Sequence, residues 1–141
     1  MIVLDTNVIS EIMRPVPDPY VMAWLAAQNS LSLTTTTITI AEIQRGICRL
    51  PTGRKREGLA ERFDGFVAEA FSNRVLSLDI DSAYLCGDVS EAREAKGLHA
   101  DTVDMMIASI AKRVGAKLAT RNIKDFEGCG IKLINPWEGG A

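Results

Sequence analysis

The stretch MIVLDTNVIS, residues 1–10, begins as an apolar run and stops abruptly at an acid. Residues 2–4 predict a short strand that is covered on both faces, and Asp5 stands directly after it. In an open α/β sheet, ligands bind at the carboxyl ends of the parallel strands. An acid is costly there unless it is solvated or paired. We therefore expect Asp5 to mark a functional edge, with Thr6 either holding Asp5 or capping the next helix.

The rest of the chain alternates between strand and helix patterns. Further strands are predicted at residues 31–37, 74–78, 117–120 and 131–134. Helices are predicted at residues 8–12, from Pro19 onwards with Asp18 as N-cap, and at residues 39–50, 54–71, 79–96 and 101–114, with Asp79 or Asp81 as the cap of the helix that ends near residue 96. Such alternation on short links favours an α/β fold, with a mainly parallel five-stranded sheet and helices on both faces. We expect a single domain over residues 1–141, with the last four residues frayed.

Composition narrows the functional classes. Of the 141 residues, 47% are apolar and 24% charged, which is typical of one globular domain and indicates neither disorder nor a membrane span. Without a signal-peptide pattern, the expected location is the cytoplasm. Three scattered cysteines argue against a disulfide framework and a paired-thiolate zinc site, and the single histidine, His99, excludes a histidine-rich one.

Four acidic positions are predicted near the same edge of the sheet: Asp5, Glu42, Asp104 and Asp125. Several carboxylates without histidine or cysteine would suit a hard cation such as Mg²⁺ or Mn²⁺. Two of them also have a purely structural interpretation. Glu42 has the place of the N3 acid of a capping box, three residues after Thr39, and Asp104 has the equivalent place after an Asp101 cap. Both interpretations are compatible with metal binding, because a helix N-terminus keeps a nearby carboxylate ionised.

Five motifs together resemble one known family. They are LDTNVISE at residues 4–11, TITIAEI at 37–43, DTVDMMIASIA at 101–111, ATRNIKDF at 119–126 and INPW at 134–137. In this order they resemble a PIN-domain ribonuclease, and within that family the toxin of VapBC-type toxin-antitoxin pairs, particularly its FitB-like branch. The resemblance spans nearly the whole chain.

The resemblance implies a function and a set of partners. Asp5, Glu42 and Asp104 would be the catalytic, metal-binding acids of an endoribonuclease that uses one or two Mg²⁺ or Mn²⁺ ions to hydrolyse RNA phosphodiesters. It also implies the sheet order 3-2-1-4-5, a homodimer, and a small VapB-like antitoxin whose C-terminal segment blocks the site.

One position departs from the family pattern. The family often has a fourth acid in the TRN stretch, where this chain has Asn122. Either Asp125 replaces that acid as a metal ligand or a second metal is weakly held. Thr120 and Asn122 would then orient water or a ligand, and Thr6 would be an accessory group.

Basic residues are concentrated in one stretch, although the net charge is only −2. A substrate strand that approaches an acidic edge needs cations nearby to offset phosphate repulsion. The candidates for RNA binding are Arg45, Arg49, Arg54, Lys55 and Arg56. The alternative is that this stretch is a solvated helix face.

Two other functional classes remain open. An acid at the end of the first strand also fits a phospho-accepting aspartate domain or a haloacid-dehalogenase-type phosphatase, in which Asp5 would take a phosphoryl group. That phosphatase pattern has a second acid two positions on, where this chain has Asn7. The other class is a catalytically weakened PIN-like binding module, in which Asn122 has removed activity and the protein works by holding a partner.

Overall fold

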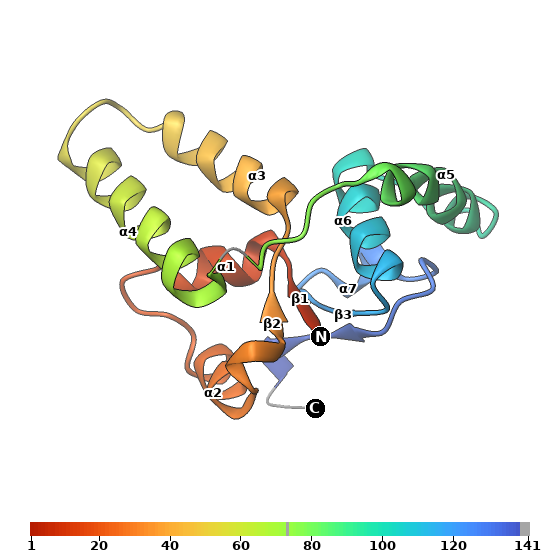
Figure 1. The fold of residues 1–141 in the computed structure, drawn as a ribbon, viewed down its shortest axis with the longest axis horizontal. Coiled ribbons are helices and arrows are strands. Elements are labelled where there is room, and N and C mark those ends of the chain that lie inside the picture. Colours follow the sequence, from red (N-terminus) through yellow and green to blue (C-terminus); the bar gives the residue numbers. More distant parts are fainter. Residues whose placement is uncertain (73, 139–141) are drawn as a thin grey trace.

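A parallel sheet forms the centre of the molecule, with helices on both sides (Figure 1). The computed structural model describes residues 1–72 and 74–138. The described strands are β1 (Ile2–Leu4), β2 (Leu33–Thr34), β3 (Lys117–Ala119) and β4 (Leu133–Ile134), in the order β2-β1-β3-β4. All three pairings are parallel, so the carboxyl ends of the strands share one edge.

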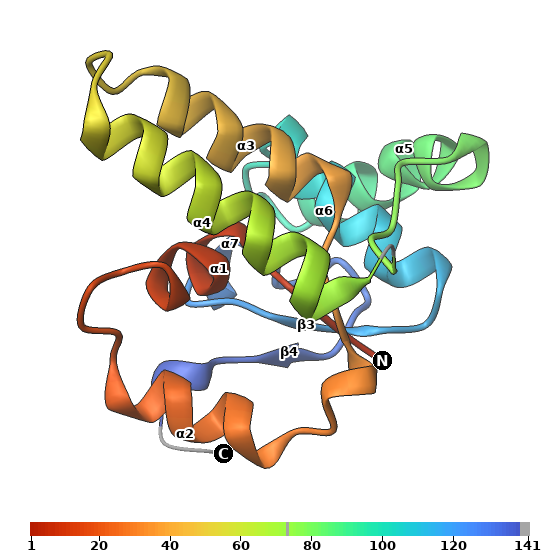
Figure 2. The same ribbon diagram turned by 60° about the vertical axis from the view of Figure 1, so that its left-hand side comes forward.

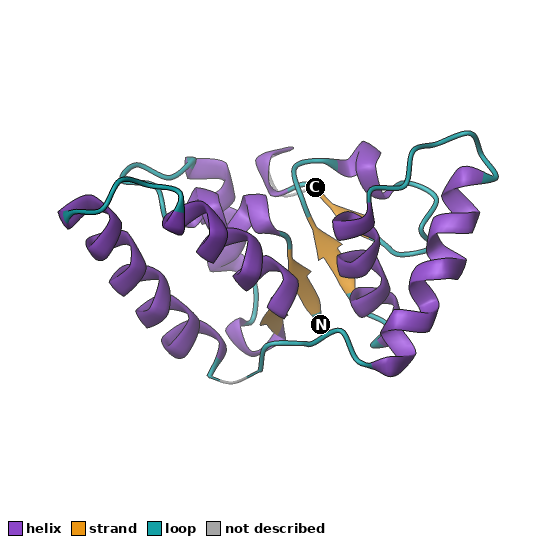
Figure 3. Cartoon of the chain, turned by 90° about the horizontal axis from the view of Figure 1, so that it is seen from above, coloured by secondary structure: helices purple, strands orange, loops and turns teal. Residues whose placement is uncertain are grey.

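Helices make up most of the remaining described residues. They are α1 (Thr6–Ile12), α2 (Pro19–Ala27), α3 (Thr37–Cys48), α4 (Arg54–Phe71), α5 (Ile80–Glu94), α6 (Thr102–Arg113), α7 (Ile123–Phe126) and the short 3₁₀ turns η1 (Ser30–Ser32) and η2 (Pro136–Glu138). Figure 2 shows α3 and α4 side by side as a long hairpin. From above, the strands lie between this hairpin and the α5-α6 pair (Figure 3).

Both faces of the sheet are buried, as the sequence predicts. Val3 and Leu4 are 0% and 1% exposed, and they belong to different hydrophobic clusters because successive strand residues point to opposite faces. Leu4 packs in a cluster with Phe63 and Phe71 of α4, whereas Val3 packs in a cluster with residues of α6. Among the described residues, no helix has the length and apolarity needed to cross a bilayer.

Three predicted helix starts are confirmed by their caps. Asp18 Oδ1 accepts the N–H of Tyr20, with proline at the first helical position of α2. Asp79 caps α5 through the N–H of Ser82, and Asp101 caps α6. These short acidic side chains satisfy N–H groups that have no partner within their own helix.

The prediction of a fifth strand at residues 74–78 is wrong. In this segment only Leu76 forms a bridge, which is parallel to Thr36, just after β2. The N–H of Leu76 donates to Thr35 O at 2.9 Å, and its carbonyl accepts from Thr37 N at 2.8 Å. The extended stretch is short because a turn after α4 joins Arg74 N to Phe71 O, and Asp79 already caps α5. If the Leu76 bridge is counted in place of the third predicted strand, beside β2 at the edge of the sheet, the observed order agrees with the predicted order 3-2-1-4-5.

Other element boundaries also differ from the prediction. The second strand is confined to Leu33–Thr34 and the last to Leu133–Ile134, and residues 121–130, for which no helix is predicted, contain α7. Glu138 belongs to η2 and its N–H donates to Asn135 O at 3.2 Å, while the fraying of the last four residues stays a prediction. The other three residues of that expectation, 139–141, lie outside the described residues.

Candidate active site

Asp5 lies where β1 ends, buried and fully hydrogen bonded. Its own N–H donates to Ala119 O of β3 at 2.9 Å, which fixes the backbone at the sheet edge. Its Oδ1 accepts the N–H of Thr6 at 2.8 Å, so Asp5 is the N-cap of α1. Thr6 occupies the first helical position, so of its two predicted roles it holds Asp5 and does not cap α1. Oδ2 accepts the hydroxyl of Thr120 at 2.8 Å and the amide of Asn7 at 3.4 Å.

Glu42 comes to Asp5 from α3. Its Oε1 accepts the hydroxyl of Thr6 at 2.6 Å, which links the start of α1 to the second turn of α3. The predicted capping box is wrong, because the N-cap of α3 lies three residues earlier: it is Thr36, whose hydroxyl accepts the N–H of Thr39 at 3.1 Å. Glu42 is therefore not needed to cap the helix, and its exposed carboxylate is available for chemistry.

Asp104 comes from the first turn of α6, as predicted. Its N–H donates to Asp101 Oδ1 at 3.0 Å, so Asp101 holds this turn while the carboxylate of Asp104 remains half-buried. Asp5, Glu42 and Asp104 thus start from three different elements. All three line one open cavity of about 480 Å³ at the carboxyl edge of the sheet, which we call the acid cavity.

Thr120 organises the floor of this site. Its buried hydroxyl donates to Asp5 and accepts from Asn7 Nδ2 at 3.2 Å and from the N–H of Asn122 at 3.1 Å. Asn7 Oδ1 in turn accepts the N–H of Arg121 at 3.2 Å. The end of β3 and the start of α1 are therefore joined by side chains, which keeps the Asp5 carboxylate in one orientation.

Burial, together with neighbouring negative charges, raises the pKa of Asp5 and Asp104. Burial is the largest cause of the raised pKa of Asp5, opposed by the hydrogen bonds from Thr120 and Thr6. Burial also raises the pKa of Asp104, from 3.8 to about 7, and the negative charges of Asp101 and Asp5 add to the shift. Because the ionised forms of Asp5 and Asp104 are disfavoured here, a bound cation would stabilise these charged carboxylates.

The donor set fits a hard divalent cation. Carboxylate, hydroxyl and amide oxygens line the cavity, with no histidine or cysteine among its lining residues. As the side chains stand, the described part of the chain holds no three acidic, histidine or cysteine residues grouped closely enough to bind one ion. Glu42 Oε1 accepts the hydroxyl of Thr6, so the exposed Glu42 side chain would have to leave this hydrogen bond to share a cation with Asp5 and Asp104.

The two candidates for the fourth position are placed differently. Asn122 lines the acid cavity, whereas Asp125 is exposed on α7 and is not among the lining residues. The charge of Asp125 is nevertheless near enough to raise the pKa of both Asp5 and Asp104.

The five predicted RNA-binding residues do not line the acid cavity. Arg45 and Arg49 lie towards the end of α3, and residues 54–56 begin α4 at the tip of the hairpin. Of the five, only Lys55 lines a cavity that also includes Glu42. The cations that do line the acid cavity are Arg14 and Arg121.

Five residues of the cavity wall were missed in the sequence: Ser10, Glu11, Arg14, Arg121 and Trp137. Two of them are paired through a cation-π contact, with the Arg121 guanidinium carbon 5.2 Å from the centre of the Trp137 ring. The signal was present in the motifs LDTNVISE, ATRNIKDF and INPW, which contain Glu11, Arg121 and Trp137. Arg14 lies just beyond the first motif, where nothing local indicated that it faces the acids.

The chain is similar in sequence, over nearly its whole length, to several known proteins. The chain is 41% identical to "Plasmid stability protein StbB" of Pseudomonas syringae pv. tomato and 39% identical to "VapC ribonuclease Y4jK" of Sinorhizobium fredii, each over 138 residues. Both alignments cover 98% of this chain and 99% of the relative. "Toxin FitB" of Neisseria gonorrhoeae is 34% identical over 137 residues, covering 97% of this chain and 99% of the toxin.

The structural comparison agrees with the sequence relatives. The crystal structure of FitAcB from Neisseria gonorrhoeae superimposes with a TM-score of 0.91 at 33% identity, over 98% of this chain and 99% of that one. The PIN domain profile matches residues 2–128. Because this match spans most of the chain and full-length relatives exceed 30% identity, the chain belongs to the PIN domain family.

Proposed function

We propose that this protein is an endoribonuclease that hydrolyses RNA phosphodiesters with Mg²⁺ or Mn²⁺ held by Asp5, Glu42 and Asp104. The observation that carries the proposal is the convergence of these three carboxylates, from separate elements, on one open cavity. A relative that bears the name VapC ribonuclease supports the same reaction. When bound, the cation would polarise the phosphate and lower the pKa of a water molecule.

The surrounding residues would position these acids. Thr120 and Asn7 hold the Asp5 carboxylate through hydrogen bonds at its Oδ2. Thr6 would release Glu42 to the cation and retain its contact with Thr39, whose hydroxyl lies 3.1 Å away. Asn122 lines the cavity and would orient water or the substrate. Asp125 does not line the cavity, so it would add negative charge near the site, and it would become a metal ligand only if α7 shifted.

We further propose that the protein is the toxin of a toxin-antitoxin pair, inhibited by a small VapB-like antitoxin. Relatives with the printed names "Toxin FitB" and VapC support this role. An apolar groove of about 490 Å³ adjoins the acid cavity and shares Thr6 and Glu42 with it. Its apolar lining, between α1, α3 and α4, includes Met13, Ile43, Ile47, Leu59 and Phe63. An apolar C-terminal segment of the antitoxin that lies there would block the approach to Glu42.

The proposed activity is tested by incubating the purified protein with total bacterial RNA. With Mg²⁺ or Mn²⁺ we expect discrete cleavage products, and excess chelator should abolish them. Mapping the ends of the products would identify the RNA and the cut site. Metal binding without cleavage would instead support a binding module, and a phosphoryl group trapped on Asp5 would support a phospho-accepting domain.

A further inference from the structure

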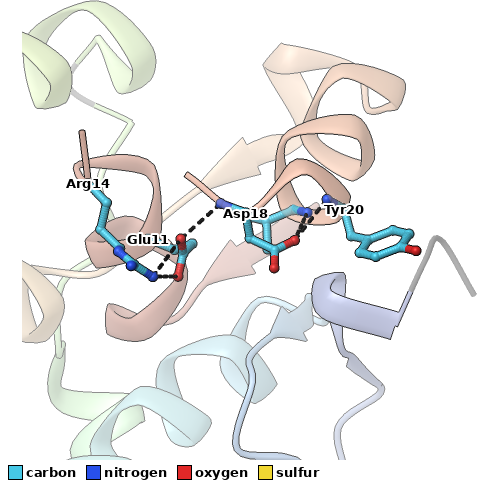
Figure 4. Close-up of polar contacts among 5 residues, drawn as sticks. Glu11, Arg14, Asp18 and Tyr20 are labelled. Carbon is cyan, nitrogen blue, oxygen red and sulfur yellow. Dashed lines mark hydrogen bonds and ion pairs between the residues drawn. The ribbon is translucent and has the colours of Figure 1, made fainter. Parts of the chain in front are cut away.

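A buried carboxylate and an exposed arginine form a pair at the end of α1 (Figure 4). Glu11 is 5% exposed, while the side chain of Arg14 is 64% exposed. Arg14 Nη1 lies 3.2 Å from Glu11 Oε1 and 3.3 Å from Oε2, so both oxygens share one nitrogen. Glu11 Oε2 also accepts the N–H of Asp18 at 2.9 Å, which fixes the carboxylate from the other side. Neither residue is among the acids and bases proposed above.

The arrangement leaves most of the guanidinium available. Within residues 1–72 and 74–138, the side-chain hydrogen bonds of Arg14 all come from Nη1, so Nη2 and Nε have no partner in the described part of the chain. Arginine presents its donors in a planar fork that matches the oxygens of a phosphate. An arginine fixed at one corner retains the donors that such a ligand needs.

The position of Arg14 places these donors beside the acids. Arg14 and Glu11 both line the acid cavity, together with Asp5, Glu42 and Asp104. Arg14 also lines the apolar groove next to it. An RNA strand that brings one phosphate to the carboxylates carries its neighbouring phosphates along the cavity wall, where Arg14 would offset their repulsion by the acids.

The need to fix the segment between α1 and α2 does not by itself explain why an arginine stands at position 14. The carboxylate of Glu11 serves that purpose through its bond to Asp18, and this bond does not require an arginine three residues along. Arg14 compensates the buried charge of Glu11, yet it does so with one nitrogen while its side chain is largely solvent exposed. The donors of Arg14 that Glu11 does not use suggest a ligand.

We propose that Arg14, positioned by Glu11, binds an RNA backbone phosphate adjacent to the one that is cleaved. This inference rests on the proposed ribonuclease function. Arg14 is then a substrate-binding residue, and Glu11 is a positioning residue that acts through it.

The test measures RNA binding in an Asp104→Asn background, so that the RNA is not cut. The probe is labelled total bacterial RNA, titrated over a series of salt concentrations. Adding Arg14→Ala should weaken binding roughly three- to tenfold at low salt and reduce the slope of log K against log salt by about 0.7 to 1. Arg14→Lys should restore part of the affinity and most of the slope, because it retains the charge but not the fork.

Lys132→Ala is the matched control, since Lys132 is exposed next to β4 and lines a cavity that contains none of the proposed acids. It should leave the affinity and slope unchanged. If the Asp104→Asn parent binds RNA and Arg14→Ala binds it equally well with the same slope, the phosphate site is disproved. If the parent does not bind RNA at all, the proposed function fails, and the assignment of Arg14 fails with it.

The role of Glu11 is tested by a double-mutant cycle. Glu11→Gln retains an acceptor for Asp18 N–H but removes the charge that orients Arg14. It should weaken RNA binding about two- to threefold in the parent and have no further effect when Arg14→Ala is present. A lower melting temperature with unchanged RNA affinity would show that Glu11 serves only the fold.

Discussion

The Asp5→Asn variant is expected to cut RNA about a hundred- to a thousandfold more slowly than the wild type while retaining its fold. The loss follows because Asp5 is the most buried of the three proposed ligands and is fixed by Thr120 and Thr6. Asparagine keeps an oxygen for the N–H of Thr6, so the cap of α1 survives. The measurement is the initial rate of RNA cleavage in Mn²⁺, with circular dichroism to verify the fold.

Asp79→Asn provides the matched control for this variant. Asp79 is also the N-cap of a helix, and it contacts Arg113 at the opposite end of α6 from Asp104. The same substitution there should leave the cleavage rate within about twofold. Equal rates for Asp5→Asn and the wild type would remove Asp5 from the mechanism.

The Asp104→Asn variant is expected to be more stable than the wild type at pH 8 without metal. The pKa of Asp104 is raised from 3.8 to about 7, mainly by burial. In a fully buried group this difference would be worth about 4 kcal/mol. Because solvent screens the half-buried carboxyl, we expect about 1 to 2 kcal/mol, or a melting temperature higher by about 4 to 8 °C.

The sign of this effect depends on pH. Below about pH 4 the carboxyl of Asp104 is protonated in both states, so wild type and variant should be similarly stable. Between about pH 4 and 7 the unfolded carboxyl loses its proton while the folded one retains it, so the wild type loses stability as the pH rises. Above about pH 7 the difference is constant. Thermal melts in chelator at pH 4 and pH 8 measure it, with Asp88→Asn on the exposed side of α5 as the control.

A destabilising Asp104→Asn substitution at pH 8 would contradict the electrostatic description of the site. It would mean that the Asp104 carboxylate makes a favourable contact in the folded protein that outweighs its burial and the repulsion from Asp101 and Asp5. In that case the acid cavity would not be a site that gains stability by binding a cation.

The backbone position of the acids could be predicted because local rules determine it. An apolar run that ends in Asp5 indicates a strand end, and Asp101 followed by Asp104 indicates a helix start. The position of Glu42 in its helix was predicted less accurately, because the start of that helix is ambiguous in the sequence. Residues 34–37 are four consecutive threonines, each a possible cap, and Thr36 is the cap in the structure, between two residues whose backbones bond to Leu76.

Tertiary contacts determine the features that the sequence did not reveal. Arg14 and Arg121 are separated by a hundred residues or more but line the same cavity. The spacing of apolar and polar residues along the sequence does not indicate such a long-range contact. The third predicted strand has the right composition, yet it is reduced to a bridge because its neighbours in the chain are a helix end and a helix cap. The basic stretch was conspicuous in the sequence, but most of it lies on the α3-α4 hairpin away from the acids.

The claim that Asp5, Glu42 and Asp104 form a metal centre is tested most directly by a thermal melt titrated with MnCl₂. The wild type should gain stability as the cation relieves repulsion among the carboxylates, by about 2.7 kcal/mol at a hundred times the dissociation constant. Asp5→Asn should lose most of this gain, while Asp79→Asn should keep it. A shift in melting temperature that is the same in Asp5→Asn and the wild type would contradict the metal centre.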